Sequence, residues 1–156
     1  SRRSVTAAEV QGRTWVTRRG IHIDRIACAW LIRRFIDPNA TVKFVDARSH
    51  SPSPRELRFD MFDAEFTHEG DLCSFEVLLR AFGLSTPALC AVAEVVHDVD
   101  LKDSKFARDE TAGIEHLIAG IAWLHPEDEK RAEHGAAVFD ALHGYFQRRR
   151  SGGKVA

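Results

Sequence analysis

The stretch TWVTRRGIHIDRIACAWLIRRFIDPNATVKFVD, residues 14–46, decides the fold because it places an amphipathic helix between two short strands. Residues 14–18 are rich in β-branched and aromatic side chains, and residues 41–46 alternate polar and apolar ones, so both are typical of strands. Between them, an apolar stripe follows residues 25–36 with the period of a helix. Two strands joined through one helix predict a βαβ unit with parallel strands and a right-handed crossover.

The residues around this unit mark where its elements end. Gly20 ends the first strand, Asp24 is well suited to cap the N-terminus of the helix, and Asp37-Pro38 ends the helix. Further along, the loop at residues 49–54 contains two prolines, and residues 57–62 are compatible with a third strand at an edge. Four more helices are predicted, at residues 72–82, 86–99, 109–124 and 126–148.

The length and composition describe one globular domain. The chain has 156 residues, of which 44% are hydrophobic and 29% charged, and this composition argues against a disordered protein. We therefore expect an α/β, helix-rich fold in which a small βαβ unit, with two or three short strands, packs against about five helices. The expected boundaries are a tail or linker remnant at 1–12, one domain at 13–148 and a flexible C-terminal tail at 149–156.

The charge and cysteine content exclude several functional classes. With 22 basic and 23 acidic residues the net charge is −1, so binding to nucleic acid or to an anionic membrane would need a local patch. No apolar run approaches the roughly 20 residues of a membrane span, and no signal peptide is visible. The cysteines Cys28, Cys73 and Cys90 form no CxxC pair, which fits a reducing compartment, so a cytoplasmic location is expected.

The loop between the first strand and the helix, residues 17–25, has the pattern of an oxyanion site. A glycine turn before a helix N-terminus presents free backbone N–H groups, and Arg18, Arg19 and Arg25 add charged donors suited to a tetrahedral dianion. These arginines are the predicted anion-binding residues. The alternative is that Asp24 occupies the same N–H groups as an N-cap while the arginines are solvated.

The segment at 66–76 contains several side chains that can bind divalent metals, namely His68, Asp71, Cys73 and Glu76. Asp71 is also a natural N-cap for the helix that follows, and this role alone would explain it. Cys73, near the same helix N-terminus, could have a lowered pKa and act as a thiolate ligand or a redox thiol, with a small buried thiol as the alternative. His68 and Glu76 are therefore the stronger ligands of this segment.

The segment at 96–103 places acidic side chains at a helix C-terminus. His97 and Asp100 are three residues apart and share a helix face, as pairs of metal ligands commonly do. The negative end of the helix dipole disfavours aspartates there, so a lysine or a metal ion is needed to compensate them. We therefore predict that a divalent metal ion of unspecified identity binds His68, Glu76, His97 and Asp100.

Seven segments, taken in order, resemble one known family. They are TWVTR (14–18), HIDRIA (22–27), WLIRRFID (30–37), RFDMF (58–62), EFTHEGD (65–71), CSFE (73–76) and VHDVDLKD (96–103). Together they are similar to the C-terminal domain of the chromate-resistance protein ChrB, and the similarity covers most of the chain. Ser74 stands where the family pattern leads us to expect threonine.

This resemblance implies a role in chromate resistance. Full-length proteins of the family carry an N-terminal region associated with DNA-binding regulation, and they accompany a chromate efflux transporter. The resemblance therefore implies a domain that senses chromate, or an associated metal or redox signal, and controls resistance genes through an attached regulatory region. Chromate or another small oxyanion is the expected ligand, and DNA would be bound only through a missing N-terminal region.

Two alternatives stay open. The first is a metal-dependent enzyme acting on an anionic or redox substrate, with Arg25 or Arg33 steering that substrate toward the metal. The second is a structural or dimerisation module, whose partner is a second copy of the chain and in which Glu76, His97 and the Arg33-Arg34 pair form a buried polar network. Both alternatives use many of the same polar side chains, so the sequence does not separate them.

Overall fold

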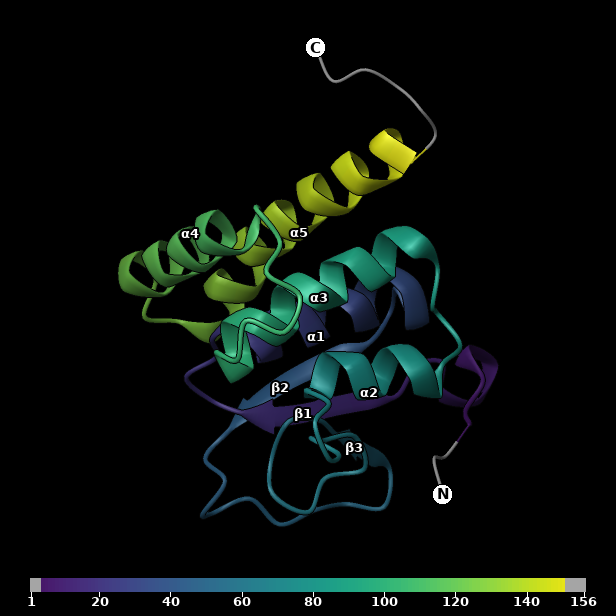
Figure 1. The fold of residues 1–156 in the computed structure, drawn as a ribbon. Helices are drawn as coiled ribbons and strands as arrows, with labels where there is room; N and C mark the ends of the chain where they lie inside the picture. Colours follow the sequence, from purple (N-terminus) through teal and green to yellow (C-terminus); the bar gives the residue numbers. More distant parts are fainter. Residues whose placement is uncertain (1–3, 151–156) are drawn as a thin grey trace.

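The computed structural model describes residues 4–150, which form a three-stranded parallel sheet covered by helices (Figure 1). β1 (Thr14–Arg18) is the central strand, with β2 (Thr41–Val45) on one side and β3 (Glu56–Arg58) on the other. β1 and β2 pair in parallel along their whole length. The predicted parallel βαβ unit is therefore confirmed, and the third strand is shorter than the predicted segment at 57–62.

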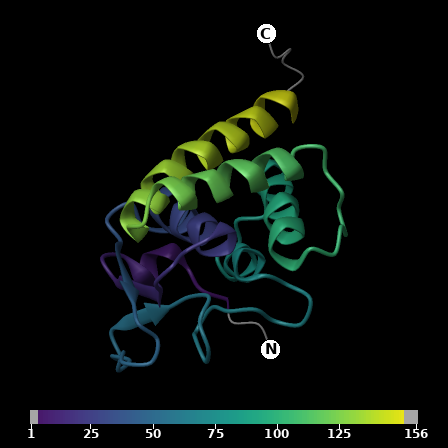
Figure 2. The same ribbon diagram turned by 90° about the vertical axis from the view of Figure 1, so that its left-hand side faces the viewer.

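Five α-helices complete the domain. They are α1 (Ile23–Leu31), α2 (Ser74–Ala81), α3 (Pro87–Leu101), α4 (Thr111–Leu124) and α5 (Asp128–Arg150), and α1 continues into a short π-helical segment, η2 (Ile32–Ile36). α1 packs against α2, α3 and α5, while α4 and α5 lie side by side on the side of the helices away from the sheet (Figures 1 and 2). The predicted helix-rich α/β fold is confirmed, and when η2 is counted with α1 the helix ends differ by at most two residues from the predicted ones.

Aromatic side chains from distant segments pack around Trp15 of β1, which is fully buried. The centroid of its ring lies 5.6 Å from that of Phe66 and 6.2 Å from those of Phe59 and Phe82. Aromatic pairs of this kind stabilise a fold by about 0.5–1.5 kcal/mol each beyond the burial of their area. These contacts join β1 to the C-terminal end of α2 and to the segment that carries His68.

Two predicted helix caps are wrong. The N-cap of α1 is His22, and Asp24 lies inside the first turn with an exposed fraction of 3%. The N-cap of α2 is Cys73, while Asp71 is exposed and pairs with Lys105. A buried carboxylate needs hydrogen-bond donors, and Asp24 finds them at the free N–H groups of the α2 N-terminus instead of at its own helix.

The segment before β1, predicted as a polar tail, is structured in its described part. It contains a 3-10 helix, η1 (Ala7–Val10), in which Val10 is buried. Val5 is buried as well, and its backbone N donates to the carbonyl oxygen of Ala81 at the end of α2, at 2.9 Å. Two apolar anchors five residues apart show no helical or strand period, so the sequence pattern could not indicate this contact.

The outer ends of both predicted tails lie outside the described residues. They are residues 1–3 and residues 151–156. Residues 149 and 150 of the predicted C-terminal tail belong to α5. Among residues 4–150, no helix is both long enough and apolar enough to cross a membrane.

Candidate functional site

The N-terminus of α2 is where the predicted site residues meet. Backbone N–H groups at a helix start have no partner within the helix, and the positive end of the dipole favours an anion there. Asp24 of α1 fills this position, since the backbone N of Ser74 donates to its Oδ2 and that of Phe75 to its Oδ1, both at 2.9 Å. Asp24 and Cys73 therefore bring two groups of polar side chains together, one around His68 and one around His97.

The first group, which we call the His68 group, consists of Asp24, Asp60, His68 and Asp100, with Arg25 at its edge. His68 Nε2 lies 3.0 Å from Asp100 Oδ2 and 3.6 Å from Asp24 Oδ2. On the other side of the ring, Nδ1 lies 3.6 Å from Asp60 Oδ1. Ligand atoms of Asp24, His68 and Asp100 all lie within 4.8 Å of one another, which is close enough for a single metal ion.

The His68 group concentrates negative charge at a partly open position. Asp24 is buried, and burial first, then the charges of Asp60 and Asp100, raise its pKa to about 7. The side chain of His68 is 45% exposed; burial alone would lower its pKa, but the hydrogen bond with Asp100 and the nearby carboxylates outweigh burial and raise it. Arg25 offsets part of this charge, because its Nε lies 3.5 Å from Asp60 Oδ2. A cation among these carboxylates would favour their ionised forms.

Asp60 is held in an uncommon backbone conformation beside His68. Its φ is 47°, in the left-handed region that costs a non-glycine residue about 1–2 kcal/mol. Ser74 Oγ donates to Asp60 Oδ1 at 2.9 Å, and Arg25 Nε donates to the Asp60 carbonyl oxygen at 3.0 Å. Backbone strain that is held by surrounding hydrogen bonds often accompanies functional sites.

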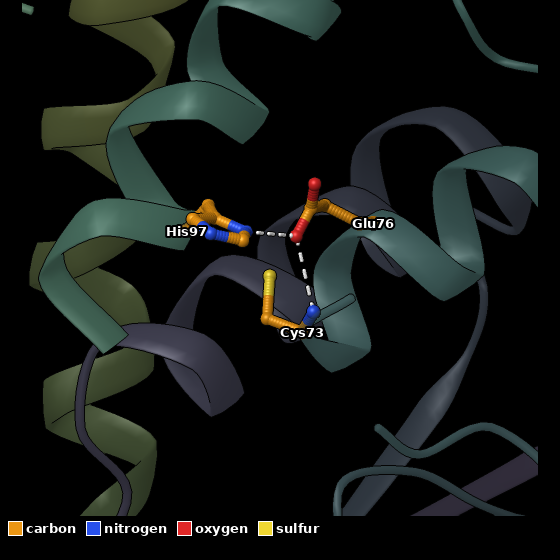
Figure 3. Close-up of side chains that lie close together, drawn as sticks. All are labelled: Cys73, Glu76 and His97. Atoms are coloured by element: carbon orange, nitrogen blue, oxygen red, sulfur yellow. Dashed lines mark hydrogen bonds and ion pairs between the residues drawn. The ribbon is translucent and has the colours of Figure 1, made fainter. Parts of the chain in front are cut away.

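The second group, which we call the His97 group, consists of Cys73, Glu76, His97 and Asp103. Figure 3 shows Cys73 and Glu76 at the start of α2 facing His97 of α3. His97 is fully buried; its Nδ1 lies 2.6 Å from Glu76 Oε1, and its Nε2 lies 2.8 Å from Asp103 Oδ2. Because each ring nitrogen faces a carboxylate, the ring suits the imidazolium form, in which both nitrogens donate. Burial alone would lower the pKa of His97, but these two hydrogen bonds outweigh it and raise the pKa.

Cys73 is the sulfur member of the His97 group. Ligand atoms of Cys73, Glu76 and His97 lie within 4.8 Å of one another, and all three residues are buried, so this group could hold a metal ion. The predicted lowering of the Cys73 pKa is wrong, because burial first, and then the charge of Asp24, raise the pKa of the thiol. Its role as a metal ligand or a redox thiol stays a prediction.

The four predicted metal ligands are divided between the two groups. His68 and Asp100 belong to the first, Glu76 and His97 to the second, and their action as ligands stays a prediction. Asp98, which follows His97, accepts backbone N–H groups of the loop after α3, and one of its carboxylate oxygens lies within 4.8 Å of ligand atoms of His97 and Asp103.

Three acidic residues of the two groups escaped the sequence analysis as site residues. Asp24 could have been found, because an aspartate next to an apolar stripe is a candidate for burial as well as for capping. Asp60 reaches His68 only because the chain turns after β3, and no local pattern indicates that turn. The sequence indicates Asp103 only as one more acidic residue near a helix end, and the loop after α3 brings it to His97.

The predicted anion-binding arginines are also divided. Arg18 and Arg19 are exposed and line a cleft of about 720 Å³ at the carboxyl ends of β1 and β2, together with Arg48. Arg19 also pairs with Asp46, at 3.3 Å. Arg25 lies in the His68 group instead, so these arginines do not form one site.

The backbone donors of the loop before α1 already hold a carboxylate. The N–H of Gly20 donates to both oxygens of Asp128 at 3.0 Å, and that of Ile21 to Asp128 Oδ1 at 2.8 Å. Asp128 begins α5, so these hydrogen bonds anchor that helix to the loop. The expected competition for these donors therefore exists, but its source is Asp128 and not Asp24.

Arg33 and Arg34 take no part in the His97 group. Arg33 donates to Glu129 Oε1 at 2.8 Å, and Arg34 pairs with Asp140, so both bind residues of α5. The predicted network around His97 is therefore wrong in its arginine members. Of the two arginines expected to steer a substrate, Arg25 alone belongs to one of the two groups.

Comparisons with known proteins show what this chain is similar to. The family model described as "ChrB, C-terminal domain" matches residues 15–146. A curated relative, "Protein ChrB" of Cupriavidus metallidurans, is 40% identical over 139 residues, which cover 88% of this chain and 42% of the relative. This chain therefore spans less than half the length of that relative. No solved structure matches it.

Proposed function

Because this chain belongs to the ChrB C-terminal domain family, which is related to chromate resistance, we propose that it is the sensory domain of a chromate-resistance protein. It binds a divalent metal ion, or an oxyanion such as chromate, and passes the bound state to an attached regulatory region. The curated relative is more than twice as long as its matched part, so that protein has room for such a region. Contact with DNA would belong to that region.

The observation that carries this proposal is the convergence of three carboxylates on one half-exposed histidine. Asp24, Asp60 and Asp100 approach the two ring nitrogens of His68 at 3.0 to 3.6 Å. Packing these acids together is unfavourable unless positive charge balances them, and burial first, then the charges of Asp60 and Asp100, raise the pKa of Asp24. A ligand from solvent can reach this position because the His68 side chain is 45% exposed.

The ligand set suits a divalent metal ion. Asp24, His68 and Asp100 would bind it, supplying two carboxylate oxygens and one imidazole nitrogen, and such mixed sets suit first-row divalent ions such as Mn²⁺ or Zn²⁺. Because these ligands come from α1, the segment before α2 and the end of α3, a bound ion would tie three elements together. This tie is the physical basis on which binding could change the surface seen by another region.

The oxyanion would bind in the cleft lined by Arg18, Arg19 and Arg48. Guanidinium groups form paired, charge-assisted hydrogen bonds with tetrahedral dianions. The same cleft contains Asp128, which anchors α5 to the loop before α1. An oxyanion that enters the cleft therefore lies beside a contact between two elements that are distant in sequence.

Titration calorimetry with Mn²⁺ tests the cation part of this proposal. We expect saturable binding by the wild-type chain, and an affinity at least about 10-fold lower after His68→Ala or Asp100→Asn, because each removes one of three ligands. His116→Ala on the exposed face of α4 is the matched control and should bind as the wild type does. Equal affinity in wild type and His68→Ala would overturn the assignment.

Titration with chromate and with sulfate tests the anion part separately. The wild-type chain is expected to bind at least one of these anions, more weakly at higher salt, and Arg18→Ala should lower that affinity. Arg80→Ala, on the exposed side of α2, keeps the net charge change equal and serves as the control. No saturable binding of either anion would exclude the cleft as their site.

A metal-dependent enzyme is the second candidate, favoured by the open side of the His68 group. A catalytic metal keeps a free coordination position for water or substrate, and Arg25 lies beside this group to orient an anionic or redox-active substrate. The test is turnover of a chromogenic phosphate ester by the metal-loaded chain, or its reduction of chromate with an added electron donor, compared with His68→Ala. Equal rates in the two proteins would exclude this function.

A dimerisation module is the third candidate, favoured by the outer face of α4. Leu117, Trp123 and Leu124 are large apolar side chains with exposed fractions of 55%, 88% and 72%. Exposed apolar side chains that gather on one helix often mark a contact with another chain. Light scattering should then report a dimer that Trp123→Glu turns into a monomer; a monomeric wild-type chain at high concentration would exclude the module.

A further inference from the structure

We propose that Cys73, Glu76 and His97 form a second metal site, separate from the His68 group, for one divalent cation of the Zn²⁺ class, closed by the loop at residues 102–107. It goes beyond the proposed function, which uses the His68 group and the arginine cleft. The two sites differ in ligand chemistry, so each can fail without the other.

The ligand set of this site differs from that of the His68 group by a sulfur atom. Cys73 Sγ, a carboxylate oxygen of Glu76 and a ring nitrogen of His97 lie within 4.8 Å of one another, and all three residues are buried. A thiolate and an imidazole favour borderline-soft ions such as Zn²⁺ and Co²⁺ over Mg²⁺ or Ca²⁺. Three protein ligands leave the fourth tetrahedral position for water or a small ligand.

Asp103 holds the ring of His97 in the orientation that a metal ligand needs. Its Oδ2 lies 2.8 Å from Nε2, so Nδ1 points toward Glu76 and Cys73. A carboxylate on the distal nitrogen of a metal-binding histidine is the usual outer partner that fixes such rings. On binding, the cation replaces the proton between Nδ1 and Glu76 Oε1, and both this proton and the proton of the Cys73 thiol are released to solvent.

The loop after α3 closes over this group in a strained conformation. Lys102, Ser104 and Ala107 have φ values of 54°, 51° and 49°, all in the left-handed region that non-glycine residues rarely adopt. Asp98 Oδ2 holds the loop in place by accepting the backbone N–H of Phe106 at 3.0 Å and that of Ala107 at 2.7 Å. Each of these three backbone conformations carries its own conformational cost. Strain of this kind is frequent at segments that clamp a ligand.

Two side chains of the same loop contact His97 directly. Asp103 binds Nε2, and the ring of Phe106 meets the His97 ring edge-on, with centroids 5.2 Å apart. Lys105 then ties the loop to the segment before α2 through Asp71, at 3.2 Å. The loop is therefore a cover over the buried ligands, and its movement is the route by which a cation enters.

A purely structural role for His97 makes a different prediction. An imidazolium between Glu76 and Asp103 is already satisfied and needs no sulfur atom nearby. The metal site instead requires the thiol of Cys73. The structural role and the metal site are therefore distinguished by whether the sulfur of Cys73 binds the cation.

Cobalt titration of the full chain provides the test, because a thiolate bound to Co²⁺ gives a charge-transfer absorption band in the near ultraviolet. We expect the band to appear in the wild-type chain, to saturate at one equivalent in His68→Ala, which lacks the other cation site, and to be absent in Cys73→Ser. Cys90→Ser is the matched control, since Cys90 lies outside this group, and it should keep the band. Absence of the band in the wild-type chain overturns the site, as does an unchanged band in Cys73→Ser.

Two further variants define the boundaries of the site. Asp103→Asn should keep the band and its stoichiometry while lowering the Co²⁺ affinity by about 10–100-fold, as expected for loss of a positioning residue; unchanged affinity overturns that role. His68→Ala should lower Mn²⁺ binding and leave the cobalt band intact, and loss of the band there overturns the separation of the two sites. Far-ultraviolet circular dichroism confirms that each variant is folded.

Discussion

The His68 group and the His97 group place the same kinds of side chain near the start of α2, but in opposite environments. His97 is fully buried, and each of its ring nitrogens has its own carboxylate at 2.6 and 2.8 Å. His68 is 45% exposed and faces three carboxylates at longer distances, of which Asp24 is buried. A histidine among acids is therefore not one motif, because burial and pairing decide how much it stabilises the fold and how easily a ligand from solvent reaches it.

The largest expected effect is on stability, and it separates the two histidines. His97→Ala leaves Glu76 buried without its partner, and removing one member of a buried ion pair costs about 3–5 kcal/mol. His68→Ala should cost less than about 1 kcal/mol, because its ring is half exposed and water can replace it. Urea unfolding with chelator present measures both. Equal losses would break the distinction between the two groups.

The next largest effect is the stabilisation that Mn²⁺ binding gives, which should depend on the His68 group and not on the His97 group. Mn²⁺ at about 100 times its dissociation constant should raise the free energy of unfolding of the wild-type chain by about 2.7 kcal/mol. His68→Ala should lose this increase, whereas Cys73→Ser should keep it, because Mn²⁺ prefers oxygen ligands to sulfur. The measurement is urea unfolding with and without Mn²⁺. If Cys73→Ser also lost the Mn²⁺-dependent increase in the free energy of unfolding, the two groups would act as a single site.

Asp24 accepts N–H groups at the start of α2 and also belongs to the His68 group. Its role as an acceptor can be separated from its proposed role as a metal ligand. Asp24→Ala leaves the N–H groups of Ser74 and Phe75 without an acceptor and should cost about 1–3 kcal/mol. Asp24→Asn keeps an acceptor for one of these two N–H groups and removes a buried charge, so it should cost less than Asp24→Ala while still weakening Mn²⁺ binding. Thermal unfolding and calorimetry of both variants check this. An equal cost in Asn and Ala would contradict the capping role.

The smallest expected effect concerns Asp71, the cap that the sequence indicated for α2. Its carboxylate is exposed and contacts Lys105, so Asp71→Ala should leave the midpoint of urea unfolding unchanged. Asp109→Ala, at another exposed aspartate, gives the reference for a surface substitution. If Asp71→Ala lost as much unfolding free energy as Asp24→Ala, Asp71 would be the N-cap of α2 after all.

The fold could be predicted because it rests on periodic patterns that are local in the sequence. The alternation in residues 41–46 and the apolar stripe at 25–36 each indicate one element, and the parallel pairing of β1 and β2 follows from their connection. The predicted helix ends also lie close to the observed ones, because glycine and proline end a helix through local backbone geometry. The short segment around Val5 shows the limit, because two isolated valines become buried only through contact with α2.

The candidate site could be predicted only in part, because its geometry depends on loops. His97 and Asp100 share a turn of α3, so spacing indicated that they lie close, yet the turn sends them to different groups. Asp24 joins α1 to a helix start 50 residues away. No local pattern encodes such a contact. Cys73 shows a further limit, since burial outweighs the helix N-terminus that would otherwise lower its pKa.

The most direct test of the central claim, two separate cation sites at the start of α2, is metal stoichiometry by equilibrium dialysis against Mn²⁺ and Zn²⁺ followed by elemental analysis. We predict two ions per wild-type chain, one in His68→Ala, one in Cys73→Ser and none in the double variant. In His68→Ala the remaining ion should be Zn²⁺, held by the His97 group. The same number of ions in all four proteins would contradict the claim.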